Sequence, residues 1–205
     1  MTEKVKKVSK TAQKIQQVAT QLFAQNGFDG TIMDELAAVT GANKASIYYH
    51  FKNKEGLYDT CMTDLFAKVV DPVIEAVEAH QAVLDKLEAY VVAFSHSAYE
   101  NRQMPAALMR EIASGGVNMP VKARQQMQRL LFTLKDILKA GQDSGELDYV
   151  DPVATHFMVI GSLCFYICSE PMRLEIESTT KTDPSVDEAT IEMVSLIKRA
   201  LVKQS

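Results

Sequence analysis

The chain has 205 residues, of which 47% are hydrophobic and 23% are charged, and its formal net charge is −4 at pH 7. These proportions are typical of a soluble globular protein with one or two domains, and they argue against a disordered chain. No apolar run reaches the roughly 18 residues that span a bilayer, and no apolar stretch follows the N-terminal lysines. The three cysteines lack the spacing of a disulfide framework. We therefore expect a cytoplasmic protein without a membrane segment.

Charge is distributed unevenly along the chain. Residues 1–60 hold eight lysines and six acidic residues, so the net negative charge lies in the remainder. A mildly basic first part on an acidic body suits a protein in which only the first part meets phosphate. Random unevenness between two solvated surfaces explains the charges equally well, so charge alone does not decide the function.

Helical periodicity dominates the sequence, and strand signals are nearly absent. Apolar residues follow the helical spacing from Ile15 to Phe23, and Asn26-Gly27 is expected to end this first helix. Thr31 stands where the N-cap of a second helix is expected, and that helix stops at Gly41. The pattern predicts two short, consecutive helices on either side of a glycine turn.

Asparagines mark the start of the next two predicted helices. Asn43 is expected to cap a short third helix, in which Ile47 and Phe51 lie four residues apart and face inward. Asn53 is expected to cap a fourth helix over about 54–70, with apolar residues along one stripe.

After Asp71-Pro72 the predicted helices become longer, with breaks that contain glycine or proline. We expect them near 82–100, 104–114, 120–142, 152–169 and 185–202. The fold class is therefore all-α, with a small N-terminal head and a larger C-terminal helical body.

A helix-turn-helix motif needs two short helices joined by a tight turn that contains glycine. The first helix braces the second, and the second places its N-terminal side chains in the major groove of DNA. Two adjacent tyrosines on the third helix are hard to explain as core, because only one of them shares a face with Ile47 and Phe51. The alternative is a simple helical corner in which one tyrosine packs and the other is exposed.

The segment TIMDELAAVTGANKASIYYHFKNKEGL, residues 31–57, resembles the signature of the tetracycline-repressor (TetR) family. It joins a threonine before the second helix, a Leu-Ala pair followed by glycine, a Ser-x-Tyr-aromatic-His-Phe third helix and a Lys-Asn-Lys-Glu-x-Leu start of the fourth. The resemblance covers about residues 10–65 and is absent from the body, although the family also has an all-helical body of this length.

The resemblance implies an N-terminal three-helix DNA-binding domain at 1–55, with its helix-turn-helix at about 32–51. An effector-binding and dimerisation domain at 56–205 would be linked to it by the fourth helix. The implied DNA contacts are Thr31 and Lys54 to phosphate, Lys44, Ala45 and Ser46 to base edges, and Tyr48, Tyr49 and His50 to the backbone and adjoining bases. Asp34 stands where family members often have arginine, which removes one phosphate contact. The lysines within residues 3–7 form either a groove-binding arm or a frayed, solvated tail.

Methionine and aromatic side chains are frequent in the body, where they form either an adaptable apolar pocket or simply the core. The resemblance implies that a small-molecule effector, largely apolar, binds between the body helices. The candidate effector residues are Phe94, His96, Met109, Arg110, Phe132, His156 and Phe165. For each of them singly, a place on the surface or in the core is the alternative.

No cofactor or metal is expected. His156, Cys164 and Cys168 share one helix face, but they span more than two turns, so a single ion cannot reach all three. Cysteines that pack as small apolar residues explain the same pattern.

A single short recognition helix reads too few base pairs, so the protein is expected to form a homodimer. The resemblance implies a four-helix bundle made by the last two helices of each copy. The candidate dimer residues are Ile160, Gly161, Cys164, Ile167, Val194, Ile197 and Leu201.

The sequence thus predicts a transcriptional repressor that binds double-stranded operator DNA and is released from it by an effector. An enzyme is the first alternative, but the chain shows no nucleophile–base grouping, phosphate loop or metal-ligand motif. A DNA-binding protein without a sensing function is the second.

Overall fold

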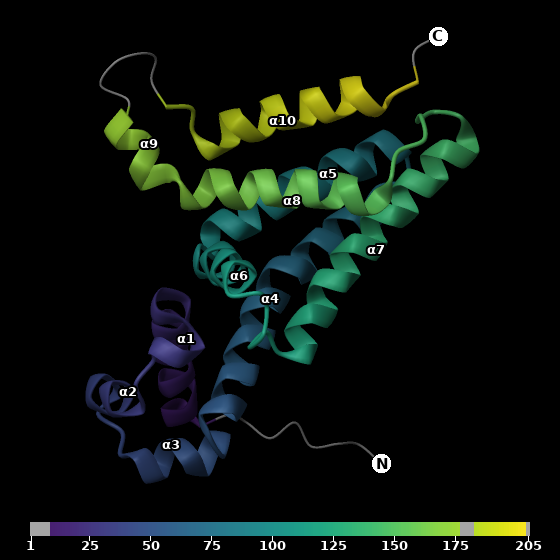
Figure 1. Cartoon of the computed structure of the whole chain (residues 1–205). Helices are drawn as coiled ribbons and strands as arrows, with labels where there is room; N and C mark the ends of the chain where they lie inside the picture. The colour runs from purple at the N-terminus through teal and green to yellow at the C-terminus, as the bar shows by residue number, and fades with distance from the viewer. Residues whose placement is uncertain (1–8, 177–182, 204–205) are drawn as a thin grey trace, which may run out of the picture.

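The structure is a computed structural model that describes residues 9–176 and 183–203, and within these ranges it is built from helices (Figure 1). The helices are α1 (Lys10–Gly30), α2 (Met33–Thr40), α3 (Lys44–Phe51), α4 (Lys54–Glu78), α5 (Val83–Glu100), α6 (Gln103–Ala113), α7 (Val121–Ser144), α8 (Pro152–Cys168), α9 (Glu170–Ile176) and α10 (Val186–Leu201). The described residues form no β-strand, only an isolated bridge between Leu147 and Val202. The expected all-α fold class is confirmed. The lysines within residues 3–7 lie outside the described ranges.

The first three helices form a small head at one end of the molecule (Figure 1). Its interior is apolar, with Ile15 and Phe23 from α1, Leu36 from α2 and Ile47 from α3 all buried. Gly27 interrupts α1 with a φ of 74° and a ψ of −179°, so the regular helix ends there as expected. The left-handed φ of 74° is a conformation that glycine adopts without steric cost.

Two asparagine caps fix the helix starts on either side of the third helix. Asn43 Oδ1 accepts a hydrogen bond of 2.7 Å from the backbone N–H of Ser46, and Asn53 Oδ1 accepts one of 2.8 Å from Gly56. These caps satisfy backbone donors that have no partner within the helix, and both were predicted. The predicted cap at Thr31 was wrong, because Ile32 precedes α2 without a side-chain cap and the Thr31 hydroxyl instead donates back to the carbonyl of Gly27 at 2.8 Å.

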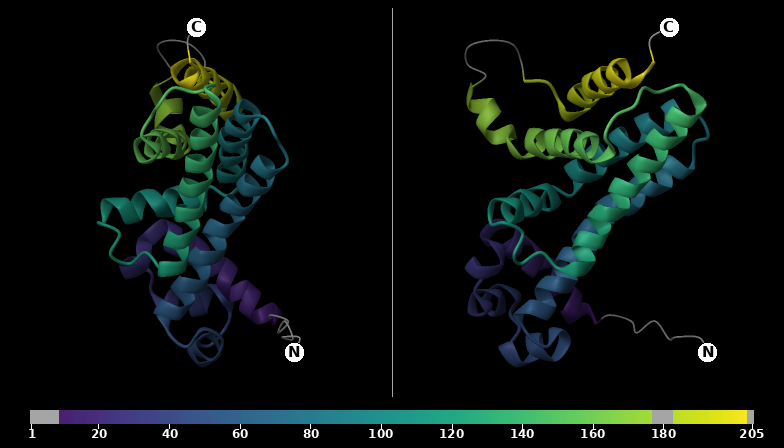
Figure 2. Two further views of the ribbon diagram at one scale, coloured as in Figure 1. Left: turned by 90° about the vertical axis from the view of Figure 1, so that its right-hand side faces the viewer. Right: turned by 45° about the vertical axis from the view of Figure 1, so that its right-hand side comes forward.

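Helix α4 leads from the head into the body and is longer than the sequence pattern suggested. It passes through Pro72 and ends at Glu78, rather than near residue 70. Proline removes one backbone hydrogen bond within a helix. The buried stripe nevertheless continues through Val73 and Val77, and packing against α5 and α7 outweighs that loss. Figure 2 shows α4 and α7 alongside each other as the long axis of the body.

The last three helices cover the end of the body that is remote from the head (Figure 1). Helix α9 was not predicted, since the sequence pattern ends one helix near residue 169 and begins the next near residue 185. Pro171 lies in the first turn of α9, where its missing N–H has no helical partner to lose. A reciprocal pair of hydrogen bonds between Ser185 and Glu188 begins α10. No helix in the described part of the chain is long and apolar enough to cross a membrane.

Candidate nucleic-acid interface

Helix α3 has one buried side and one exposed side. Ile47 is fully buried, whereas Tyr49 is 85% exposed and Tyr48 is 39% exposed. Lys44 and Ala45 are exposed at the start of the same helix, and Ser46 is half-buried. Phe51, which was expected to face inward with Ile47, is half-buried against the core. The exposed side of α3 therefore carries hydroxyl, methyl, ammonium and aromatic groups. Its other side packs against the core of the head.

The ammonium of Lys44 is paired with a neighbour on the preceding helix. Its Nζ lies 2.6 Å from Oδ1 of Asp34, and both side chains are largely exposed. The hydrogen bond to Asp34 raises the pKa of Lys44, so this lysine stays charged. Asp34 thus neutralises one of the few positive charges on the exposed side of α3.

Replacement of Asp34 by asparagine is expected to tighten binding to duplex DNA by about threefold to tenfold, because it removes a negative charge beside the DNA and frees Lys44 to contact it. The slope of log Kd against log salt concentration should also become steeper. A fluorescence-anisotropy titration at several salt concentrations measures both.

The matched control for this prediction is Glu35→Gln, which removes an exposed negative charge from the same helix. An equal gain in both variants would show a general charge effect and would contradict the specific role of the Asp34–Lys44 pair.

The remaining predicted DNA contacts lie at the edges of α3. His50 is half-buried, with Nε2 3.5 Å from Oγ of Ser9. Lys54 Nζ lies 4.7 Å from the centroid of the Phe28 ring, so this lysine packs against α1. Thr31 is only 2% exposed and its hydroxyl is engaged within the head, which places it behind the surface rather than on it.

Lys52 is a cation that the sequence analysis did not single out. It follows α3 directly, is exposed, and has a φ of 67° in the turn to α4. A positive φ is uncommon for a residue other than glycine. Its neighbourhood in sequence, Lys-Asn-Lys, was interpreted as the start of the fourth helix rather than as part of the exposed surface.

The predicted effector residues do not come together in one place. Phe94 is buried in the core, and His96 is exposed with Nε2 3.1 Å from Oδ1 of Asp187. Met109 is half-buried, and Arg110 Nε lies 3.4 Å from the carbonyl oxygen of Ala24 in the head. Two further candidates, Phe132 and Phe165, have largely exposed rings.

One predicted effector residue, His156, lines a substantial cavity. An open cleft of about 670 Å³ lies between α6, α7 and α8, and apolar side chains form most of its wall. Nδ1 of His156 lies 3.1 Å from the hydroxyl of Tyr90, and burial lowers the pKa of this histidine. The imidazole is therefore neutral at pH 7 and contributes polarity without charge to the cleft.

Glu111 also lines this cleft, and the sequence analysis missed it. Its side chain is only 4% exposed, and its Oε1 accepts a hydrogen bond of 2.5 Å from the hydroxyl of Tyr58 on α4. Its other oxygen, Oε2, is buried and has no hydrogen-bond partner among the described residues. Burial, together with Glu111, raises the pKa of Tyr58, which remains a neutral donor.

Most of the predicted dimer residues belong to the core of the protomer. Ile160, Cys164, Ile167 and Leu201 are buried, whereas Gly161, Val194 and Ile197 are half-buried. The exposed large apolar side chains of α8 and α10 are Val153, Phe157, Met158, Phe165, Ile191 and Leu196. Periodicity does not distinguish these faces, because α8 is apolar nearly all round.

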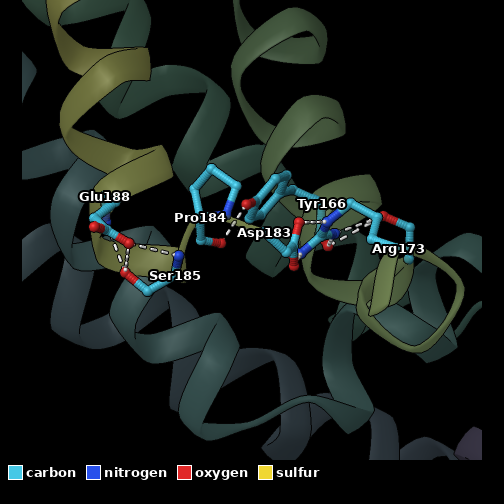
Figure 3. Close-up of polar contacts among 7 residues, drawn as sticks. Tyr166, Arg173, Asp183, Pro184, Ser185 and Glu188 are labelled. Carbon is cyan, nitrogen blue, oxygen red and sulfur yellow. Dashed lines mark hydrogen bonds and ion pairs between the residues drawn. The ribbon is translucent and has the colours of Figure 1, made fainter. Parts of the chain in front are cut away.

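Helices α8, α9 and the start of α10 are held together by an arginine (Figure 3). Arg173 on α9 pairs with both carboxylate oxygens of Asp183, at 2.8 and 3.1 Å. Its guanidinium lies 3.6 Å from the centroid of the Tyr166 ring on α8, and the Tyr166 hydroxyl donates to the carbonyl of Pro184 at 2.6 Å. These contacts hold α8 and α9 against the residues that directly precede α10, as Figure 3 shows.

The chain is similar to bacterial regulators over the head and over most of its length. Residues 15–61 match the family described as "Bacterial regulatory proteins, tetR family". The chain is 23% identical over 190 residues to the HTH-type transcriptional regulator RutR of Escherichia coli, covering 93% of this chain and 89% of RutR. It is 27% identical over 134 residues to IcaR of Staphylococcus epidermidis, a negative transcriptional regulator of the biofilm operon icaADBC, covering 65% of this chain and 66% of IcaR.

The whole fold also has a solved counterpart. A regulatory protein of the tetR family from Rhodococcus RHA1 superimposes with a TM-score of 0.78 at 20% identity, covering 97% of this chain and all of that one. The match over residues 15–61 falls on α1 to α3 and the start of α4, where the exposed side of α3 lies. The match identifies the head as a DNA-binding domain of the tetR type, and over most of its length the chain is similar to bacterial transcriptional regulators.

Proposed function

We propose that this regulator is a dimeric repressor that reads operator DNA with α3 and leaves it when a small, largely apolar molecule binds in the body. The observation that carries the proposal is the two-sided character of α3, where Ile47 is fully buried and Tyr49 is 85% exposed. A large aromatic side chain in water has an apolar surface that a DNA backbone would cover.

The assignment of DNA contacts follows the direction of α3. Its N-terminal turn carries Lys44, Ala45 and Ser46, and the N-terminal turn of a recognition helix enters the major groove. The Ala45 methyl then contacts a thymine methyl group, and Lys44 and Ser46 bond to base edges. Tyr48 and Tyr49 follow in the next turn and contact the sugar–phosphate wall, with Lys54 and Lys52 at its edge.

Dimerisation is supported by the apolar side chains that α8 and α10 expose. Phe165 is 59% exposed and Met158 is 71% exposed, although the opposite face of the same helix is buried in the core. Exposed clusters of this kind mark surfaces that another protein covers. A second copy is the natural partner, because a two-fold dimer presents two copies of α3 to two DNA half-sites.

Replacement of Phe165 by glutamate is expected to convert the dimer into a monomer, because it would bury an unpaired charge in an apolar interface. Operator affinity should then fall by at least about 100-fold, since a monomer reads one half-site. Analytical ultracentrifugation and a gel-shift titration measure the two effects.

Phe132→Glu is the control, because Phe132 is also about half exposed but lies on α7. A Phe165→Glu protein that stayed dimeric at micromolar concentration would show that the interface lies elsewhere.

The cleft between α6, α7 and α8 is proposed as the effector site. Its volume of about 670 Å³ lies within the usual range for small-molecule pockets. The head and the body, divided near residue 55, are joined by α4, which begins directly after α3 and packs against α6. An effector that favours a different position of α6 and α4 would shift the population toward dimers whose two α3 helices no longer match the half-site spacing.

Repression is tested by transcription in vitro from a promoter that overlaps a duplex selected by the protein. IcaR, a relative of this chain, is named as a negative regulator, and a protein bound over a promoter blocks polymerase. We expect the transcript level to fall as protein is added. An unchanged or increased level would overturn the repressor assignment.

A further inference from the structure

We propose that Glu111 is the carboxylate that senses the effector: it binds a protonated amine on an otherwise apolar small molecule, and through Tyr58 it transmits this binding to the DNA-binding head. The inference rests on the proposed function and adds the chemical class of the effector and the contact that carries the signal.

The first support is the state of the Glu111 carboxylate. The side chain is 96% buried, since 4% of it is exposed, and one of its oxygens has no hydrogen-bond partner among the described residues. A buried polar atom without a partner is costly, and more so when it belongs to a charged group. Because Glu111 lines a ligand-sized cleft, a ligand that reaches this carboxylate as the side chain adjusts would supply the missing donor.

The second support is the chemistry of the cleft around it. The wall of the same cleft includes Leu108, Met127 and Phe157, which favour an apolar ligand body. Arg124 also lines the cleft, but it is exposed, and no ion pair between Arg124 and Glu111 is found among the described residues. A ligand amine would therefore meet a carboxylate that forms no ion pair with a cation among the described residues. An ammonium group donates hydrogen bonds and compensates the buried charge at once.

The third support is the path that leads from Glu111 to the head. The Tyr58 hydroxyl donates to Oε1 of Glu111, and the Tyr58 ring lies edge-on to Phe23 and Phe28 of α1, with centroid distances of 4.8 and 5.1 Å. The Phe28 ring also contacts Lys54, the first residue of α4, whose Nζ lies 4.7 Å from the ring centroid. A continuous series of contacts thus joins the cleft to the residue that follows the α3–α4 turn.

A second contact joins α6, the helix that carries Glu111, to the head. Arg110, which precedes Glu111 on α6, lies close to the kink in α1, where a Cβ on Gly27 would be 3.0 Å from the arginine Cδ. A movement of α6 therefore shifts the Arg110 side chain that lies against α1. An ammonium bound to the Glu111 carboxylate competes with the Tyr58 hydroxyl for its negative charge, so the hydrogen bond between α6 and α4 is weakened. The head is then free to take the position that does not fit the operator.

Three probes with one hydrocarbon body test the recognition: 1-naphthylmethylamine, 1-naphthylmethanol and 1-naphthoic acid. Their binding to the full chain is measured by the shift in melting temperature and by calorimetric titration. We expect the amine to bind at least tenfold more tightly than the alcohol or the acid. Glu111→Gln keeps an acceptor for Tyr58 but removes the charge, so it should abolish this preference. Glu78→Gln, an exposed change at the end of α4, should preserve it.

The relay is tested separately with Tyr58→Phe. This variant keeps the carboxylate and should bind the amine within about threefold of the wild-type affinity. In the wild-type protein the amine should weaken duplex binding by at least tenfold, and in Tyr58→Phe by less than twofold. Tyr149→Phe, at a tyrosine that is 82% exposed, is the matched control and should behave as wild type.

The outcomes separate this inference from the function on which it rests. If the amine binds no better than the alcohol or the acid, Glu111 is not the recognition group. If Tyr58→Phe releases DNA as the wild type does, Tyr58 is not the relay. Either result leaves operator binding and repression intact, whereas failure of the proposed function would appear as absent duplex binding by the protein without any probe.

Discussion

Replacement of Tyr49 by alanine is expected to weaken operator binding by about 30-fold or more while the melting temperature stays unchanged. Tyr49 is 85% exposed on α3, so the free protein loses little when its ring is removed. In the complex the ring covers the DNA backbone, and loss of such a contact costs about 1 kcal/mol or more. A two-fold dimer uses the residue twice, so about 2 kcal/mol is lost, which corresponds to about 30-fold in Kd.

The control for Tyr49→Ala is Tyr149→Ala, which removes an equally exposed ring from the connection between α7 and α8. Fluorescence anisotropy gives the affinity, and a circular dichroism melt gives the stability. If Tyr49→Ala bound the operator as tightly as the Tyr149 control, the exposed side of α3 would not be the DNA-binding surface.

Replacement of Arg173 by alanine is expected to lower the free energy of unfolding by about 2–4 kcal/mol, because it removes the bidentate ion pair with the Asp183 carboxylate. The two side chains are 18% and 15% exposed, so solvent compensates only part of the lost ion pair. The stacking on Tyr166 is lost as well. For a chain of this size the melting temperature should fall by about 5–10 °C.

Arg173→Lys provides the comparison, since lysine keeps the charge but lacks the planar fork that bonds both oxygens of Asp183. Its melting temperature should lie between those of wild type and Arg173→Ala. Because α8 and α10 carry the proposed dimer surface, both variants should also dimerise more weakly. An unchanged melting temperature in Arg173→Ala would contradict the role of this residue in holding α8 and α9 against the start of α10.

The head was predictable because its signals are local in sequence. Asn43 and Asn53 cap helices through side-chain bonds to residues three positions ahead, and the alternation around Ile47 depends only on helical geometry. The role of Thr31 could not be predicted from local sequence. A threonine before a helix is a common N-cap, but the kink at Gly27 brings a carbonyl within reach and takes the hydroxyl instead.

The body was predictable only in outline. The end of α4 was misplaced because the cost of Pro72 is local, whereas the packing that offsets it comes from α5 and α7. The two apolar sides of α8 look alike in sequence, and only the fold decides that Cys164 faces the core and Phe165 faces outward. Glu111 and Tyr58 are 53 positions apart in the sequence, so no local spacing predicts their hydrogen bond.

The most direct test of the account is selection of duplex DNA from a randomised library by the purified wild-type protein. A dimer that reads DNA with two copies of α3 should enrich a two-fold symmetric sequence, with half-sites about one helical turn apart or a multiple of it. The Tyr49→Ala protein should enrich that sequence far less. Enrichment of no sequence, or of an asymmetric one that Tyr49→Ala selects equally well, would contradict the claim that α3 is the surface that reads the operator.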